Sequence, residues 1–150
     1  MNSGRTPMRA ASLRRLEDAE MLYKTGRWLG AIYLHGYWVE MTIKVRLMEE
    51  YGVNTLEALN QSLQRHFRLR VSPETHRTHS IHWLTGFLPG FIRLREASVL
   101  RKEDVHTLRN LQLVATWTSE LRYSPDSGSR LEAEEFMAAA QTIVKFIKHS

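Results

Sequence analysis

The residues of this chain that could carry chemistry are its histidines, its arginines and one acid–base pair. The sequence has seven histidines and no cysteine, which excludes a thiolate metal site and a cysteine nucleophile. His76, His79 and His82 recur at every third position. On a helix, residues with this spacing drift around the axis instead of converging, so they predict no metal site. Glu40 and Lys44 lie one helical turn apart, and this spacing predicts an ion pair within one helix.

Basic residues form two clusters along the chain, each close to aromatic residues. The first cluster is Arg65, Arg68, Arg70 and Arg77, and the second is Arg93, Arg95, Arg101 and Lys102. The aromatic residues near them are His66, Phe67, Trp83 and Phe91. One interpretation is a solvated surface; the other is contact with single-stranded RNA, whose bases stack on aromatic rings. The net charge of +5 favours an anionic partner, because binding releases the counterions of a phosphate backbone.

Apolar residues spaced three and four apart predict an all-α protein. The first expected helix follows about Pro7, carries apolar residues from Leu13 to Tyr23 and ends at Gly26. The others run from Arg27 to about Tyr51, from Asn54 or Thr55 to about Arg70, from Thr78 or Ser80 to Leu88, from about Lys102 to Glu120, and from about Arg130 to Lys148. Loops are expected over Val71 to Thr78 and over the stretch SPDSGS. No glycine-rich phosphate loop, internal repeat or alternating strand pattern competes with this interpretation.

Glycine and proline positions define the ends of these helices. Gly26 and Gly52 are placed to end the first two, and Pro89 interrupts the short helix. Gly36 lies inside a helix, where glycine costs about 1 kcal/mol relative to alanine, so we expect a close neighbour there. The simplest architecture is an antiparallel four-helix bundle with one or two additional short helices, formed by a single domain of residues 8–150 after a disordered terminus of residues 1–7.

Two functional classes find no support in the sequence. No apolar run approaches the roughly 18 residues of a membrane span, and the first residues lack the apolar segment of a secretory signal. We therefore expect a cytoplasmic protein without a membrane partner. We also expect no metal and no other cofactor.

A more specific pattern begins at the second helix. Its residues are Gly26, Arg27, Ala31, Gly36, Tyr37, Glu40 and Lys44, followed downstream by Thr78-His79 with Leu84, and by Trp117 with Arg122-Tyr123. In order and spacing, over about Leu13 to Lys148, this pattern resembles the HEPN family (higher eukaryotes and prokaryotes nucleotide-binding domains). The resemblance implies a four-helix bundle, commonly a homodimer. It also implies a partner such as a nucleotidyltransferase or an antitoxin, because family members are often encoded in such modules.

Many members of that family are metal-independent endoribonucleases, with an arginine, a polar residue, and a histidine four to six residues after the arginine. In family order this motif falls at Arg109-Asn110, but valine, alanine and threonine occupy positions 114 to 116. The chain therefore lacks the imidazole expected as general acid or base. Three other arginines are followed by a histidine four to six residues later, which is about as many as chance predicts. These pairs are Arg70 with His76, Arg77 with His82, and Arg101 with His106. The last of these lies nearest to the expected helix.

Two main hypotheses follow from the resemblance and the missing histidine. The first is a non-catalytic protein whose polar groove binds RNA, a nucleotide or a partner protein. The groove residues are Glu40, Lys44, Arg109, Asn110, Arg122 and Tyr123, with Glu40 orienting the guanidinium of Arg109. The alternative is a metal-independent endoribonuclease in which Arg109 stabilises the pentavalent phosphate and His106 or Tyr123 replaces the missing histidine. A structural subunit whose basic faces meet an acidic protein is a third possibility.

Overall fold

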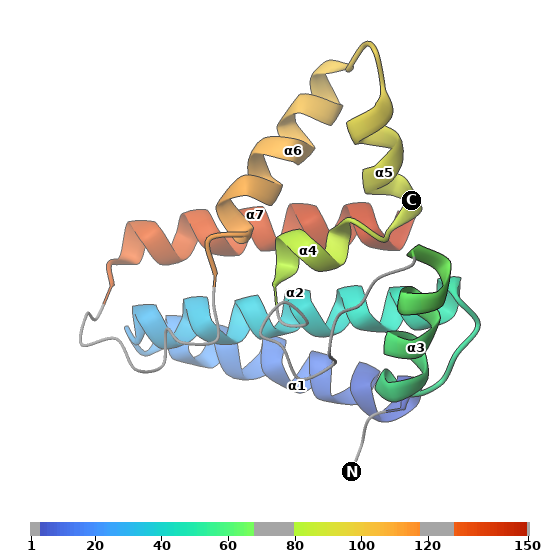
Figure 1. The fold of residues 1–150 in the computed structure, drawn as a ribbon. Helices are drawn as coiled ribbons and strands as arrows, with labels where there is room; N and C mark the ends of the chain where they lie inside the picture. Colours follow the sequence, from blue (N-terminus) through green and yellow to red (C-terminus); the bar gives the residue numbers. More distant parts are fainter. Residues whose placement is uncertain (1–3, 68–79, 118–127, 150) are drawn as a thin grey trace.

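The computed structural model describes residues 4–67, 80–117 and 128–149, and these residues form seven helices (Figure 1). The helices are α1 (Arg5–Lys24), α2 (Trp28–Glu50), α3 (Leu56–Phe67), α4 (Ile81–Thr85), α5 (Pro89–Glu96), α6 (Lys102–Val114) and α7 (Arg130–His149). Within those ranges the only extended pairing is an isolated bridge between Gly4 and Thr55. The predicted all-α class is confirmed.

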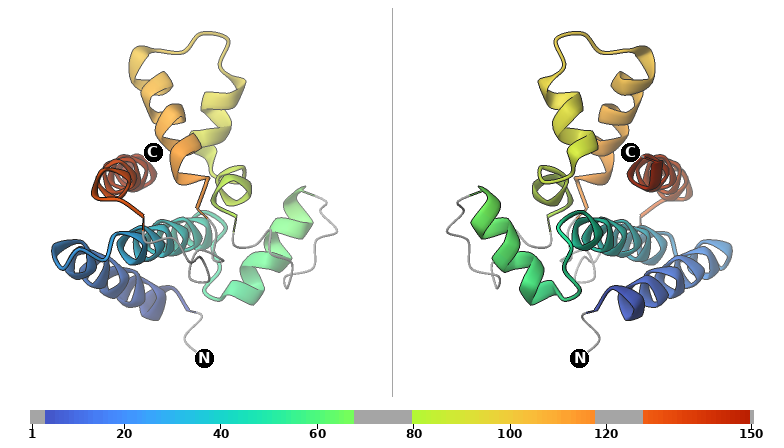
Figure 2. Two further views of the ribbon diagram at one scale, coloured as in Figure 1. Left: turned by 90° about the vertical axis from the view of Figure 1, so that its left-hand side faces the viewer. Right: turned by 90° about the vertical axis from the view of Figure 1, so that its right-hand side faces the viewer.

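Helix α2 lies at the centre of the molecule, with α1 and α7 alongside it (Figures 1 and 2). Helix α1 runs antiparallel to α2, since Arg9 near its start forms an ion pair with Glu49 near the end of α2. Helix α7 runs in the same direction as α2, because Gly128 before α7 packs against Leu29 in the first turn of α2. The end of α1 is joined to α7 by a hydrogen bond from the Tyr23 hydroxyl to Glu134.

One hydrophobic core takes residues from all seven helices. Helix α2 contributes buried residues to this core from most of its circumference. Ala31, Trp38 and Val45 lie on one side of the helix, and Val39 and Ile43 lie on others. This explains why its sequence is apolar over so many positions. A helix that is covered on several sides needs no continuous polar face.

The predicted helix ends are confirmed where glycine or a capping hydroxyl defines them. Gly26 and Gly52 have φ of 76° and 65°, the left-handed conformation that glycine adopts without strain. Ser80 caps α4, as its hydroxyl accepts a hydrogen bond of 3.2 Å from the amide of Trp83. Thr55 caps α3 in the same way, through a 3.1 Å bond from the amide of Ala58.

Three features of the predicted architecture were wrong. Residues 5–7, expected to be disordered, form the first turn of α1. Helix α6 ends at Val114 and not at Glu120, because the chain turns there and the Trp117 amide donates to the Val114 carbonyl at 3.1 Å. Three shorter helices accompany α1, α2, α6 and α7 instead of one or two, since Pro89 starts α5 as a separate helix.

Helices α5 and α6 form a hairpin that rises above α4 and α7, with α6 in contact with α7 (Figure 1). Helix α6 reaches the core through the buried residues Leu111 and Val114 and the partly buried Leu108. The predicted loop from Val71 to Thr78 and the stretch SPDSGS lie wholly or mostly outside the described residues. No helix within the described ranges is both long enough and apolar enough to cross a membrane.

Candidate nucleic-acid interface

Trp117 fixes the end of the α6 segment against the middle of α2. Its indole nitrogen donates a hydrogen bond of 3.0 Å to the carbonyl of Tyr33, and its ring lies 5.1 Å from that of Tyr37. A Cβ atom on Gly36 would lie 2.1 Å from this indole nitrogen, so only glycine fits under the ring. The close approach predicted at Gly36 is therefore present, and its cause is the packed Trp117 side chain.

Glu40 and Lys44 continue the same side of α2 beyond Gly36. Their charged groups are 3.3 Å apart, and their side chains are only 4% and 9% exposed. The predicted pair within one helix is confirmed. Removing either charge of this pair would leave the other less compensated in a poorly solvated place.

Arg109, the proposed phosphate-binding arginine, does not meet Glu40. It lies exposed on α6, and within the described ranges no hydrogen bond or ion pair joins it to Glu40 or Lys44. The described residues of the predicted groove therefore lie in two separate places. Glu40 and Lys44 form a buried pair on α2, and the others belong to an exposed polar stretch on α6.

That exposed stretch contains His106, Arg109 and Asn110. The side-chain amide of Asn110 donates to the backbone carbonyl of His106 at 2.8 Å and lies 3.3 Å from Nε2 of its ring. His106 is itself exposed. The structure thus places an accessible imidazole one helical turn from an arginine, although in the opposite chain order to the family motif.

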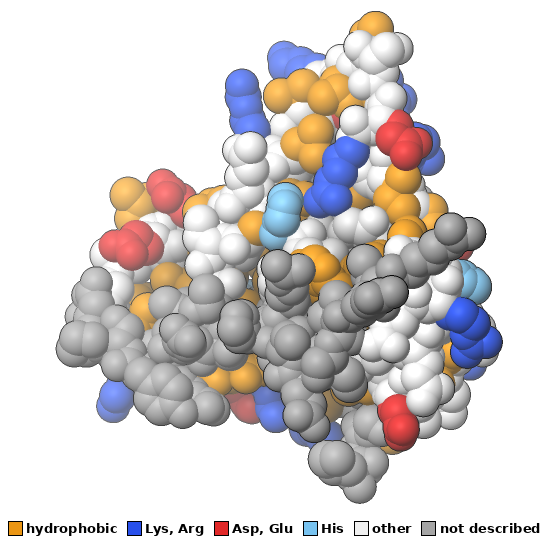
Figure 3. Space-filling model, in the orientation of Figure 1, with side chains coloured by type: hydrophobic (Ala, Val, Ile, Leu, Met, Phe, Trp, Pro, Cys, Tyr) orange, Lys and Arg blue, Asp and Glu red, His pale blue; other side chains and the backbone are white. Residues whose placement is uncertain are grey.

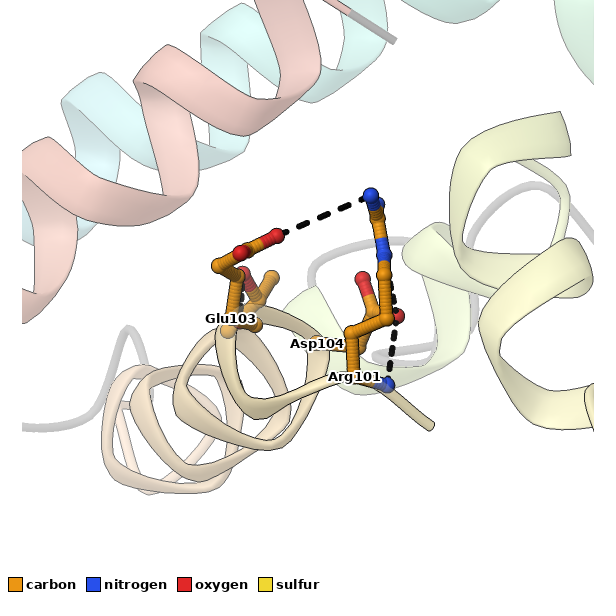
Figure 4. A network of polar contacts seen from close by, with 4 residues as sticks. Arg101, Glu103 and Asp104 are labelled. Atoms are coloured by element: carbon orange, nitrogen blue, oxygen red, sulfur yellow. Dashed lines mark hydrogen bonds and ion pairs between the residues drawn. The ribbon is translucent and has the colours of Figure 1, made fainter. Parts of the chain in front are cut away.

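Arg101, the other candidate partner of His106, is held by carboxylates (Figure 4). Its guanidinium lies 3.5 Å from Asp104 and 3.7 Å from Glu103, and its backbone amide donates to Asp104 at 3.1 Å. This arrangement caps the start of α6 and places two negative charges beside the arginine. Arg101 therefore serves the helix end and is poorly suited to hold a phosphate.

The end of α3 brings a basic residue beside exposed rings. Arg65 and His66 are exposed, and Phe67 is 37% exposed although its ring packs edge-on against Phe87 at 4.7 Å. Trp83 of α4 is half-buried, and its ring packs 4.8 Å from that of Phe87. We call the residues Arg65, His66, Phe67 and Trp83 the aromatic–basic surface.

Further basic residues lie on the α5–α6 hairpin above this region, where Lys and Arg side chains are visible in the space-filling view (Figure 3). Arg95 of α5 approaches α4, with its guanidinium 3.4 Å from the hydroxyl of Thr85. The remaining predicted site residues lie outside the described residues: Arg68, Arg70, Arg77, Arg122 and Tyr123. The same holds for His76 and His79.

Two features were not expected from the sequence. His35 is fully buried on α2, where Nδ1 donates 2.8 Å to the carbonyl of Ala31. Ser12 and Thr42 form a hydroxyl pair, 3.3 Å apart, between α1 and α2. His35 and Thr42 lie on a second buried side of α2. Residues of this side recur at spacings of three and four in the sequence, but this pattern overlaps with the main apolar pattern.

Within the described ranges, no three His, Asp or Glu side chains are grouped so that they could hold a metal ion. No protein-family model matches this chain, and neither a curated protein nor a solved structure matches it.

Proposed function

We propose that this chain is a HEPN-like helical protein that binds single-stranded RNA without cleaving it. In this proposal α1, α2, α6 and α7 correspond to the four helices of the family's antiparallel bundle, and the protein is a homodimer. A nucleotidyltransferase or an antitoxin is the kind of partner that the family resemblance adds. The proposal is carried by the aromatic–basic surface at the end of α3.

Exposed aromatic rings beside an arginine suit an unpaired RNA strand. Phe67 and His66 offer ring faces or edges to bases, and Arg65 supplies charge for the phosphates. Stacking of a base on an aromatic side chain contributes about 1–3 kcal/mol and tolerates every base. The net charge of +5 adds an attraction that does not depend on sequence.

The absence of cleavage is supported by the acid–base residues themselves. Glu40 and Lys44 form a buried ion pair, and the exposed guanidinium of Arg101 lies beside two carboxylates. No histidine follows Arg109 at the spacing that the family's nucleases use. A general acid or base near neutral pKa is thus missing from the position where it would be needed.

The proposal is tested by gel-shift titration of the protein with a mixed-sequence single-stranded RNA. Phe67→Ala should weaken binding by about fivefold or more through lost stacking, and Arg65→Ala should weaken it less and reduce the salt dependence. Met21→Ala is the matched control, because Met21 is a 61% exposed hydrophobic residue on α1. Urea unfolding of each variant separates lost binding from lost folding, since Phe67 also packs on Phe87.

Equal binding by all three variants would contradict the proposed surface. An absence of RNA binding by the folded wild-type protein would instead favour a partner protein, since Arg65 and the α5–α6 hairpin could equally meet an acidic surface. A free nucleotide added in competition with the RNA tests whether the surface binds a nucleotide instead.

The second candidate function is a metal-independent endoribonuclease, and the observation that favours it is the accessible stretch of α6. His106 is exposed, its ring is oriented by Asn110, and Arg109 lies one turn away. An imidazole can transfer protons as a general acid or base, and an arginine can stabilise a pentavalent phosphate. RNA cleavage that disappears in His106→Ala would establish this function in place of the first.

A further inference from the structure

Helices α1 and α7 lie on the same side of α2 and form the two walls of a wedge (Figure 2). The walls are joined at one end by the hydrogen bond between Tyr23 and Glu134. Toward the other end, they leave a groove of about 320 Å³. The groove is lined by Arg9, Ser12, Leu13, Trp38, Thr42, Val45, Arg46, Glu49, Ile147 and Lys148.

The floor and one wall of this groove are apolar. Trp38, Val45 and Ile147 are buried core residues that face it, and Leu13 on α1 is 56% exposed at its edge. The volume is in the range of sites that hold small molecules and is at the lower end of that range. An apolar chain or ring lying along the floor would cover Leu13 and gain hydrophobic stabilisation in proportion to the covered area.

The hydroxyl groups in the groove are already satisfied by the protein. Thr42 donates a 2.7 Å hydrogen bond to the carbonyl of Trp38, so its oxygen accepts the hydrogen of Ser12 across 3.3 Å. Neither hydroxyl therefore has a hydrogen left to donate to a ligand in this arrangement. The groups that can hold a ligand's polar end are the charged residues at the rim.

The rim of the groove carries more positive than negative charge. Its cations are Arg9, Arg46 and Lys148, and its single carboxylate is Glu49. Glu49 accepts a hydrogen bond from Arg9 and lies 3.7 Å from Arg46, and Arg46 also lies 3.7 Å from Glu50. Lys148 takes part in none of the ion pairs formed by the described residues. An anion at the rim would balance the charge of Lys148.

We infer that this groove binds a small amphiphilic carboxylate, with the carboxylate at Lys148 and Arg9 and the apolar chain over Trp38. The site is independent of the proposed RNA-binding function. It uses the side of α2 that carries Trp38, Thr42 and Val45, and this side faces away from Glu40 and Lys44 on the helix.

The test uses octanoate as the probe and octanol as its uncharged counterpart, followed by NMR of the ¹⁵N-labelled full chain. Octanoate should shift the indole signal of Trp38 in a saturable way. Octanol should bind about fivefold more weakly or worse, because it cannot use the rim cations. The indole signal of Trp38 is identified by its absence from the spectrum of Trp38→Phe.

Two pairs of variants separate the rim from the wall. Lys148→Ala should weaken octanoate binding by about threefold to tenfold and leave octanol binding unchanged. Lys145→Ala is its control, being an exposed lysine on α7 that does not line the groove. Leu13→Glu should abolish octanoate binding by placing a negative charge at the edge, whereas Met21→Glu, exposed elsewhere on α1, should not.

Failure of octanoate to shift the Trp38 signal would overturn the inference. Equal affinity for octanol and octanoate, with no effect of Lys148→Ala, would overturn it as well, since the rim would then have no role. RNA binding should be the same in Leu13→Glu and wild type, so failure of this site and failure of the RNA-binding proposal are distinguishable.

Discussion

His35 is a buried titratable side chain with unequal surroundings at its two ring nitrogens. Nδ1 donates to the Ala31 carbonyl at 2.8 Å, whereas Nε2 has no hydrogen-bond partner among the described residues. Burial lowers the pKa of His35 below 6.5, and the hydrogen bond to Ala31 and the charge of Glu20 only partly oppose this. Protonation of the imidazole therefore disfavours the folded state.

The consequence is a loss of stability in acid. Unfolded His35 has its ordinary pKa near 6.5 and binds a proton that the folded protein excludes, so the free energy of unfolding should fall as the pH drops below about 6.5. Urea unfolding at about pH 7.5 and about pH 5.5 measures this fall. We expect a smaller fall in His35→Gln, and the wild-type fall in the exposed control His149→Gln. An identical pH dependence in wild type and His35→Gln would contradict the assignment.

At the scale of elements, Gly36 decides how closely the segment after α6 packs on α2. Gly36→Ala should displace the Trp117 indole, break its hydrogen bond to Tyr33, and destabilise the protein by about 1–3 kcal/mol in urea unfolding. Gly30→Ala is the matched control on the same helix. Its Cβ would meet only the movable end of Leu22, at 3.1 Å, and alanine favours the helix by about 1 kcal/mol. Equal effects of the two substitutions would contradict the close approach.

The elements themselves were largely predictable, because their signals are local. Glycine with a positive φ ended α1 and α2 where expected, and Ser80 began α4. The end of α6 was not predictable in the same way. Apolar spacing continues past Val114, and only the tertiary position of Trp117 on Gly36 explains the turn there. Residues 5–7 were similarly misjudged, since Pro7 is acceptable in a first helical turn.

The candidate site was less predictable than the fold, because it depends on which helices meet. Spacing alone predicted the Glu40–Lys44 pair, since both residues lie on one helix. The expected meeting of Glu40 with Arg109 required α6 to lie along α2. In the structure, α6 packs against α7 instead, and Arg109 is exposed. His35 and the Ser12–Thr42 pair were missed because the second buried side of α2 overlaps with the first in the sequence pattern.

At the scale of the whole molecule, we propose two separate binding surfaces on this basic helical protein. The aromatic–basic surface lies at the end of α3, and the wedge lies between α1 and α7. The polar stretch of α6 is a third accessible region. Whether its residues cleave RNA distinguishes the two proposed functions. His106 is the accessible imidazole there, and Arg109 is its neighbouring phosphate-binding candidate.

The most direct measurement is incubation of the purified protein with a mixed RNA pool in EDTA, beside Arg109→Ala and His106→Ala. One native gel and one denaturing gel then report retained and cleaved RNA. We predict that all three proteins retain the RNA and that none cleaves it, because the family's histidine is missing after Arg109. Cleavage by wild type that is lost in both variants would contradict this account and establish a metal-independent nuclease on α6.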